Sequence, residues 1–230
     1  MGKETIQISL TQPTLFNFTQ TTRGAVELFP EVWGAMEDLI SPITSHRHAA
    51  LDRLLKLNAP RLSSLVAYLL ATRITDPDLT VRARVIRVIG DIYSPDERSQ
   101  PISDSVKSAL SSYLAQMDAG VVTNLIAASI FDASLFSHVA RLLNYCPNAA
   151  SHLVEMIMDR KASLEERRQA TELIGRVGFL EALPALERLY TRLGARMKGQ
   201  QSMPFAPPPT HDEAELLPVV EKALNHLQVR

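Results

Sequence analysis

Cysteine is nearly absent from this chain of 230 residues, in which Cys146 is the single one. No disulfide can therefore form within the chain, and nothing in its cysteine usage points to an oxidising compartment. We interpret Cys146 as a small apolar residue on a helix. A chain of this length can bury a sufficient core without disulfides or bound metal.

An excess of one charge is also missing, because 24 lysines and arginines nearly balance 25 aspartates and glutamates. The formal net charge is -1, and acidic and basic residues are well mixed along the sequence. A general nucleic-acid binder uses a long-range positive field to collect phosphates. The charge balance excludes such a field, so we find no strong signal for nucleic-acid binding.

Long apolar runs do not occur either. The longest weakly charged stretch, residues 120–131, is too short to span a bilayer and contains Thr123, Asn124 and Ser129. The first 22 residues lack the charged region and the apolar core of a secretory signal. We therefore expect no membrane contact and a cytoplasmic location.

Motifs of known catalytic chemistry are absent: no Walker, G-x-S-x-G, G-x-G-x-x-G or H-E-x-x-H sequence occurs. His46 and His48 are two residues apart, so on a helix they point about 200° from one another around the axis. His152 and Glu155 share a helix face, but such a pair is only half of a metal site. We expect no catalytic residue, no metal and no cofactor, and a protein that is not an enzyme.

What the sequence does contain is apolar periodicity, of two kinds. Near the start, Ile6, Ile8 and Leu10 alternate with polar residues, which predicts an extended N-terminal arm over 1–22. From about Gly24 onward the apolar residues recur at helical spacing between Pro, Asp, Ser or Asn breaks. The predicted helices span 24–40, 44–57, 60–72, 78–93, 103–117, 119–131, 134–146, 148–160, 163–178, 181–196 and 212–228.

One later segment, residues 197–210, has four prolines and no apolar period. We predict a proline-rich linker there. The helices within 23–196 then form one body, and the helix within 211–230 docks onto it as a terminal second helix.

Internal repetition is a stronger signal than periodicity alone. The pattern E-x-L-P-x-x-E-(R/K) occurs at 181–188 and again, 34 residues later, at 215–222. After Pro60, Pro184 and Pro218 alike, apolar residues follow at the second, fifth, sixth and ninth positions. We expect each of these prolines to open a helix near its first turn and the apolar positions to form its buried stripe.

The helices that precede these prolines share a second pattern. One series consists of Arg82, Val85, Val88 and Gly90, and it matches a second series of Arg167, Ala170, Leu173 and Gly175. A third, weaker series begins with Arg47 and Ala50. Segments 76–93 and 163–196 resemble HEAT repeats, segment 44–72 resembles them less closely, and the resemblance covers about half of the chain. It implies an all-α fold, an α-solenoid of stacked antiparallel helix pairs with about ten to eleven helices. It also implies that Asp76, Asp78 and Arg82 make turn contacts and hydrogen bonds between repeats.

The segment 118–160 departs from the HEAT pattern. It contains three predicted helices, so either one repeat carries an odd helix or the stack changes direction there. Asp132 is the only charged residue between 120 and 140. We therefore expect the helices of 120–140 to be the most buried of the molecule.

We expect this protein to be a non-catalytic scaffold or adaptor that binds a protein or peptide in a groove between stacked helices. Two alternatives stay open. One is a HEAT-like enzyme or enzyme subunit, similar to a DNA glycosylase or a phycobilin lyase. The other is a structural assembly subunit whose N-terminal arm reaches into a neighbour.

A candidate binding site follows from the register of Pro184 and Pro218. Four residues point away from the buried stripes of their two helices: Arg188, Arg192, Lys222 and Asn225. If the two helices are neighbours, these side chains form one cationic ridge. Such a ridge suits an acidic helix or a peptide terminus.

Overall fold

The computed structural model describes residues 29–94, 102–159, 161–202 and 211–229, and every regular element within these ranges is helical. The α-helices are α1 (Pro30–Leu39), α2 (Thr44–Lys56), α3 (Ala59–Leu62), α4 (Ser64–Ala71), α5 (Leu79–Ile92), α6 (Asp104–Ala115), α7 (Ala119–Phe131), α8 (Phe136–Leu143), α9 (Ala149–Met158), α10 (Leu164–Val177), α11 (Leu183–Ser202) and α12 (His211–Gln228). Short 3-10 helices add η2 (Thr72–Thr75), η3 (Ala133–Leu135) and η4 (Leu180–Ala182). The all-α prediction is confirmed for these ranges, and the predicted arm over 1–22 lies outside them.

The helix count exceeds the expected ten to eleven because the predicted helix over 60–72 is broken at Ser63. Ser63 has extended backbone angles (φ -118°, ψ 125°), and its hydroxyl accepts a hydrogen bond from the Val66 amide. It therefore ends α3 and caps α4. The break also shifts the apolar register, so that Leu62 and Leu65 are 36% and 44% exposed instead of buried.

The proline positions agree with the repeat only in part. Pro60 and Pro184 are each the second residue of a helix, as expected. Pro218 lies inside α12, which begins at His211, so the expectation that this proline opens a helix is wrong. A proline inside a helix leaves the carbonyl four residues before it without an amide donor. That residue is Ala214, whose exposure lets water take the place of the donor.

The end of α11 also differs from the prediction. This helix continues to Ser202, beyond the expected end at residue 196, so the first part of the predicted linker over 197–210 is helical. The residues between 196 and 202 include Met, Lys and Gln, which form helices readily, and the first proline follows only at Pro204. Residues 203–210 lie outside the described ranges.

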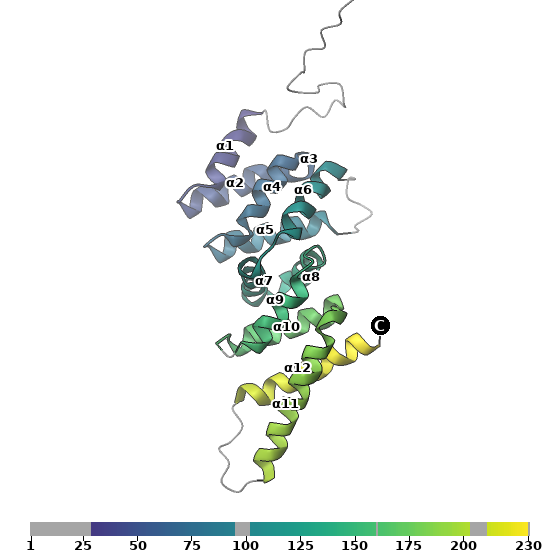
Figure 1. Ribbon diagram of the computed structural model, residues 1–230. Coiled ribbons are helices and arrows are strands. Elements are labelled where there is room, and N and C mark those ends of the chain that lie inside the picture. Colours follow the sequence, from purple (N-terminus) through teal and green to yellow (C-terminus); the bar gives the residue numbers. More distant parts are fainter. Residues whose placement is uncertain (1–28, 95–101, 160, 203–210, 230) are drawn as a thin grey trace, which may run out of the picture.

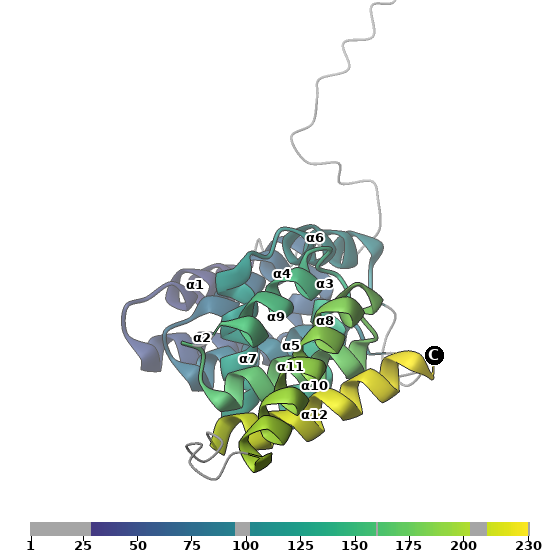
Figure 2. The same ribbon diagram turned by 60° about the horizontal axis from the view of Figure 1, so that its bottom comes forward.

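The helices build an elongated body, with α1 near one end and α11 and α12 at the other (Figure 1). One series of packing contacts runs from α2 to α5, α8, α10 and α12, and another joins α1, α4 and α6. Figure 2 shows α1, α4 and α6 above α2, α5 and α10. In the second half of the chain, α9 packs against α10, and α11 packs against α12.

The predicted irregular segment 118–160 contains α7, α8 and α9, and α7 contacts α5, α8, α9 and α10. The low charge of α7 led us to expect that it would be among the most buried helices. It is not, and Phe131 at its end is 53% exposed. The side chains of Thr123 and Asn124 donate hydrogen bonds to carbonyls of the same helix, so these uncharged residues can lie near the surface. The more buried helix is α5, in which even Arg82 is buried.

Three arginines at matching positions of α2, α5 and α10 bind main-chain carbonyls that precede their own helices. The contacts are Arg47 Nη1 to Ser41 O at 3.0 Å, Arg82 Nη2 to Asp76 O at 2.7 Å, and Arg167 Nε to Ile157 O at 2.9 Å. Such hydrogen bonds satisfy buried carbonyls that lie outside the helical ladders. The matching arginines of the sequence repeat therefore have the same structural role.

The two matching glycines, Gly90 and Gly175, also share a role. A Cβ atom at Gly90 would lie 2.7 Å from Cβ of His138 in α8, and one at Gly175 would lie 3.0 Å from Cα of Ala223 in α12. The separation at Gly90 is too short for a Cβ atom, and the one at Gly175 would require the neighbouring backbone to shift, so glycine permits the close approach of the next helix. The contact between α5 and α8 depends on Gly90, and the contact between α10 and α12 depends on Gly175.

Candidate partner-binding surfaces

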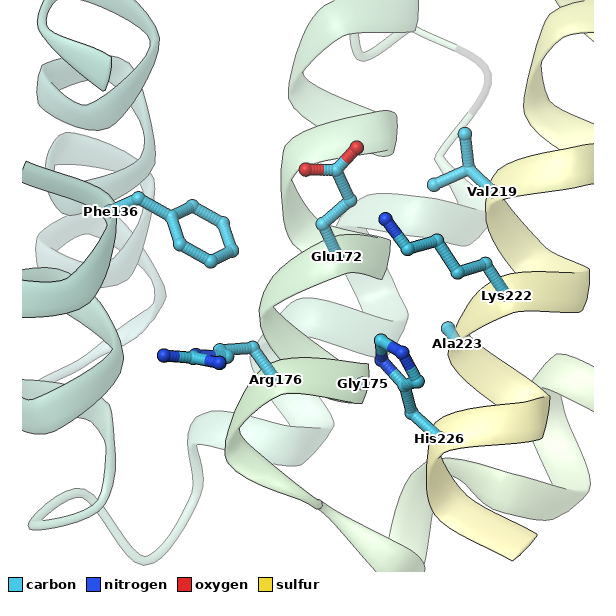
Figure 3. Close-up of a pocket in the computed structure, with 8 residues that line it drawn as sticks. All are labelled: Phe136, Glu172, Gly175, Arg176, Val219, Lys222, Ala223 and His226. Carbon is cyan, nitrogen blue, oxygen red and sulfur yellow. The ribbon is translucent and has the colours of Figure 1, made fainter. Parts of the chain in front are cut away.

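A groove with a volume of about 250 Å³ lies between α8, α10 and α12 (Figure 3). Its lining comprises Phe136 from α8; Glu172, Gly175 and Arg176 from α10; and Val219, Lys222, Ala223 and His226 from α12. We call it the α8–α10–α12 groove. It is the first candidate for a partner-binding surface.

Helix geometry explains why these side chains meet. Glu172 and Arg176 are four residues apart on α10, and Lys222 and His226 are four residues apart on α12, so each pair shares one face of its helix. The close contact between Gly175 and Ala223 brings these two faces together. Figure 3 shows Glu172 and Arg176 on α10, Lys222 and His226 on α12, and Gly175 and Ala223 at the approach of these two helices.

The charge of the groove is mainly positive. Arg176 and Lys222 are cationic, His226 becomes cationic when protonated, and Glu172 is the one acidic residue of the lining. Lys222 is exposed, and among the described residues it has no hydrogen bond or ion pair. The lysine ammonium is therefore available to an anionic group from outside the described part of the chain.

An aromatic side chain closes the groove on the α8 side. Phe136 is the first residue of α8 and is partly buried against the core. Together with Val219 and Ala223 it supplies the apolar part of the lining. The groove can therefore bury an apolar side chain of a ligand and place an acidic one near Lys222.

A second hollow lies on α11, and its lining comes from this helix alone. It has a volume of about 590 Å³ and is lined by Pro184, Glu187, Arg188, Thr191, Arg192 and Ala195. Nη2 of Arg192 lies 3.8 Å from Sδ of Met158 in α9. We call this surface the α11 hollow.

The structure divides the four predicted binding residues between different surfaces. Arg188 and Arg192 line the α11 hollow, Lys222 lines the α8–α10–α12 groove, and Asn225 is exposed but lines neither. All four are exposed, as their register predicted. The two helices are neighbours, but the hollow that Arg188 and Arg192 line is separate from the groove that Lys222 lines.

Most of the groove was not predicted from the sequence. Phe136, Glu172, Arg176 and Val219 are not among the residues that the repeats have in common. His226 had a detectable signal, because it lies four residues after Lys222 and must share its face. The contributions of α8 and α10 depend on packing between helices, which the sequence pattern does not report.

His46 and His48 have different partners. His46 Nδ1 is 3.4 Å from the Ser41 hydroxyl, whereas His48 Nε2 is 3.0 Å from the Thr80 hydroxyl. His152 Nδ1 lies 3.9 Å from Oε2 of Glu155, so the predicted pair does form. Within the described ranges, no group of three or more His, Cys, Asp or Glu side chains is arranged to hold a metal ion.

No single helix in the described part of the chain combines the length and the apolar character needed to cross a membrane. The pair α6 and α7 meets those criteria only when its two helices are counted together, and they are bent by 106°.

Comparison with known proteins gave no match: no family model fits the chain, and neither the curated proteins nor the solved structures contain a similar one. Function must therefore be inferred from the residues and geometry described above.

Proposed function

We propose that this chain is a non-catalytic scaffold of the HEAT-repeat type, an α-solenoid of stacked antiparallel helix pairs that acts in the cytoplasm. Two repeated packing features support the proposal. Arg47, Arg82 and Arg167 each bind a main-chain carbonyl that precedes the arginine's own helix, and Gly90 and Gly175 both permit a close helix contact. Repeated contacts between successive helices are typical of solenoids.

The scaffold binds an acidic peptide or helix in the α8–α10–α12 groove. The observation that carries this proposal is the combination of the unpaired, exposed Lys222 with an apolar lining formed by Phe136, Val219 and Ala223. The described residues hold no ion-pair partner for this lysine. A carboxylate of the partner supplies one, and an apolar side chain three or four residues away fills the groove beside Phe136.

The α11 hollow is the weaker candidate. Its two arginines are accompanied by Glu187, and its lining has Pro184 and Ala195 as apolar groups but no aromatic residue. Arg192 is also directed at Met158 of its own chain. The α8–α10–α12 groove therefore offers both the charge and the apolar surface that a peptide anchor needs, and the α11 hollow offers mainly charge.

A peptide selection tests the proposal. A random library of helical peptides is selected on the full chain, and the binding of enriched peptides is measured by fluorescence anisotropy. We expect enrichment of peptides with acidic residues and a large apolar residue at helical spacing. Lys222→Glu should weaken their binding roughly tenfold, which corresponds to about 1.4 kcal/mol. Added salt should weaken it as well, because the contact is between charged groups near solvent.

The matched control is Arg188→Glu with Arg192→Glu, which reverses charge on the neighbouring helix but leaves the groove unchanged. This variant should bind the selected peptides with nearly the affinity of the unmodified chain. If it loses binding while Lys222→Glu does not, the α11 hollow is the binding surface. If the enriched peptides carry no acidic residues, the proposed partner chemistry is wrong.

A further inference from the structure

An apolar groove with a volume of about 660 Å³ lies at the opposite end of the molecule from α12. It is lined by Phe29, Pro30, Glu31 and Val32 at the start of α1 and by Leu57 and Leu62 near the corner between α2 and α3. Asn58, with a left-handed backbone (φ 53°), turns the chain at that corner. We call this surface the N-terminal groove.

The exposed surface of α1 near this groove is apolar. Phe29, which lines the groove, is 58% exposed, and Trp33, one turn further along the helix, is 54% exposed. The hollow on α11, at the other end, is instead lined mainly by charged and polar side chains. The terminal repeats of a solenoid require a polar outer face for solubility. We therefore expect another segment to bury the apolar face of α1.

The sequence that precedes α1 has the composition of such a cover. Residues 5–22 contain no charged side chain, and they include six large apolar ones: Ile6, Ile8, Leu10, Leu15, Phe16 and Phe18. This stretch leads directly to Phe29, which is itself part of the groove lining. Ten residues lie between Phe18 and Phe29, and a fully extended chain over these eleven steps reaches up to roughly 36 Å.

We infer that residues 15–18 of the same chain occupy the N-terminal groove. The covalent connection favours this occupant, because a short linker raises the effective concentration of a tethered segment to the millimolar range. Leu15, Phe16 and Phe18 supply apolar side chains for a lining that has Glu31 as its single charged residue. The burial of aromatic side chains against this lining stabilises the contact through the hydrophobic effect.

The single tryptophan provides the first measurement. Trp33 lies four residues after Phe29, so it shares the face of α1 that borders the groove. In the full chain, Leu62→Glu and the double variant Phe16→Ser, Phe18→Ser should each shift tryptophan emission to longer wavelength. Both should also raise quenching by acrylamide. The matched controls are Leu79→Glu, since Leu79 has the same 36% exposure as Leu62, and Asn17→Ser, and neither should change the emission.

Hydrogen exchange provides the second measurement. Amides of residues 15–18 should exchange more slowly in the unmodified chain than in Leu62→Glu, and circular dichroism should show that this variant keeps its helices. Exchange at 15–18 that is equally fast in both proteins would overturn the inference. So would sedimentation that shows a dimer dissociated by Leu62→Glu, because the occupant would then belong to a second copy.

Discussion

Arg47 and Asp76 form a buried ion pair in which Nε of Arg47 lies 2.9 Å from Oδ2 of Asp76, with side chains 6% and 0% exposed. Asp76 also accepts a hydrogen bond from the Asp78 amide, and Arg47 donates to the carbonyls of Ser41 and Pro42. The pair joins α2 to the loop that precedes α5. The two buried charges therefore connect elements that are far apart in the sequence.

Removal of one member of this pair should be costly. Arg47→Met leaves the Asp76 carboxylate buried without its counterion, and we expect the free energy of unfolding to fall by about 3–5 kcal/mol. Adding Asp76→Asn should recover part of the loss, because no buried charge then remains. Urea denaturation measures both effects. Arg53→Met removes the partner of the exposed Asp38 and should cost less than about 1 kcal/mol.

The contact between α10 and α12 should not tolerate a side chain at Gly175. Gly175→Val places atoms against the backbone of Ala223, and we expect a loss of about 1–3 kcal/mol in thermal or urea unfolding. Gly194 in α11 has open space around its Cβ position. Gly194→Ala should therefore stabilise the chain by about 0.5–1 kcal/mol. Equal effects of the two substitutions would contradict the packing argument.

Asp78 should make stability depend on acid pH. Hydrogen bonds from the Thr80 side chain and from the amides of Val81 and Thr80 lower the pKa of this N-cap carboxyl from its ordinary value of 3.8. A pKa that is lower in the folded state gives a contribution fully present above the unfolded pKa and lost as the pH falls through the folded pKa.

Because the pKa of Asp78 is lowered in the folded state, substitutions at this position should change stability by an amount that depends on pH. Asp78→Asn keeps a cap acceptor, so the stability difference from the unmodified chain should shrink as the pH falls below about 4. Asp78→Ala loses the cap and should cost about 0.5–2 kcal/mol at neutral pH. Urea denaturation of both variants at several pH values measures these effects. A stability difference between Asp78→Asn and the unmodified chain that grows as the pH falls would contradict a lowered pKa of Asp78.

Cys146 should react slowly in the native protein. Its thiol is 3% exposed, and burial raises its pKa above the ordinary value of 9.0, so little thiolate is present near neutral pH. Alkylation by iodoacetamide, followed by mass spectrometry, should accelerate over the same range of urea concentration in which helicity is lost. Rapid alkylation without denaturant would show that the thiol is accessible.

Local signals in the sequence were sufficient to predict where several helices begin and end. Asp78 and Ser163 cap α5 and α10 where the sequence predicted helix starts, and Gly178 ends α10 with a left-handed backbone (φ 92°). These signals depend on residues within one or two turns, so they can be read along the chain. The break at Ser63 was missed because the apolar pattern continues across it.

The candidate site depended on contacts between helices. The register placed Arg188 and Lys222 correctly on exposed faces, because a helical wheel describes one helix at a time. It did not show that these two side chains line different surfaces, or that Phe136 of α8 lines the same groove as Lys222.

The sequence by itself therefore determined the all-α content, most helix boundaries and the repeated positions of Arg82, Arg167, Gly90 and Gly175. The tertiary structure alone decided which surfaces these helices present together. The physical reason is that helical periodicity arises from neighbouring residues, whereas a groove arises where packed helices bring distant residues together. At the α8–α10–α12 groove, the approach of Ala223 to Gly175 brings those residues together.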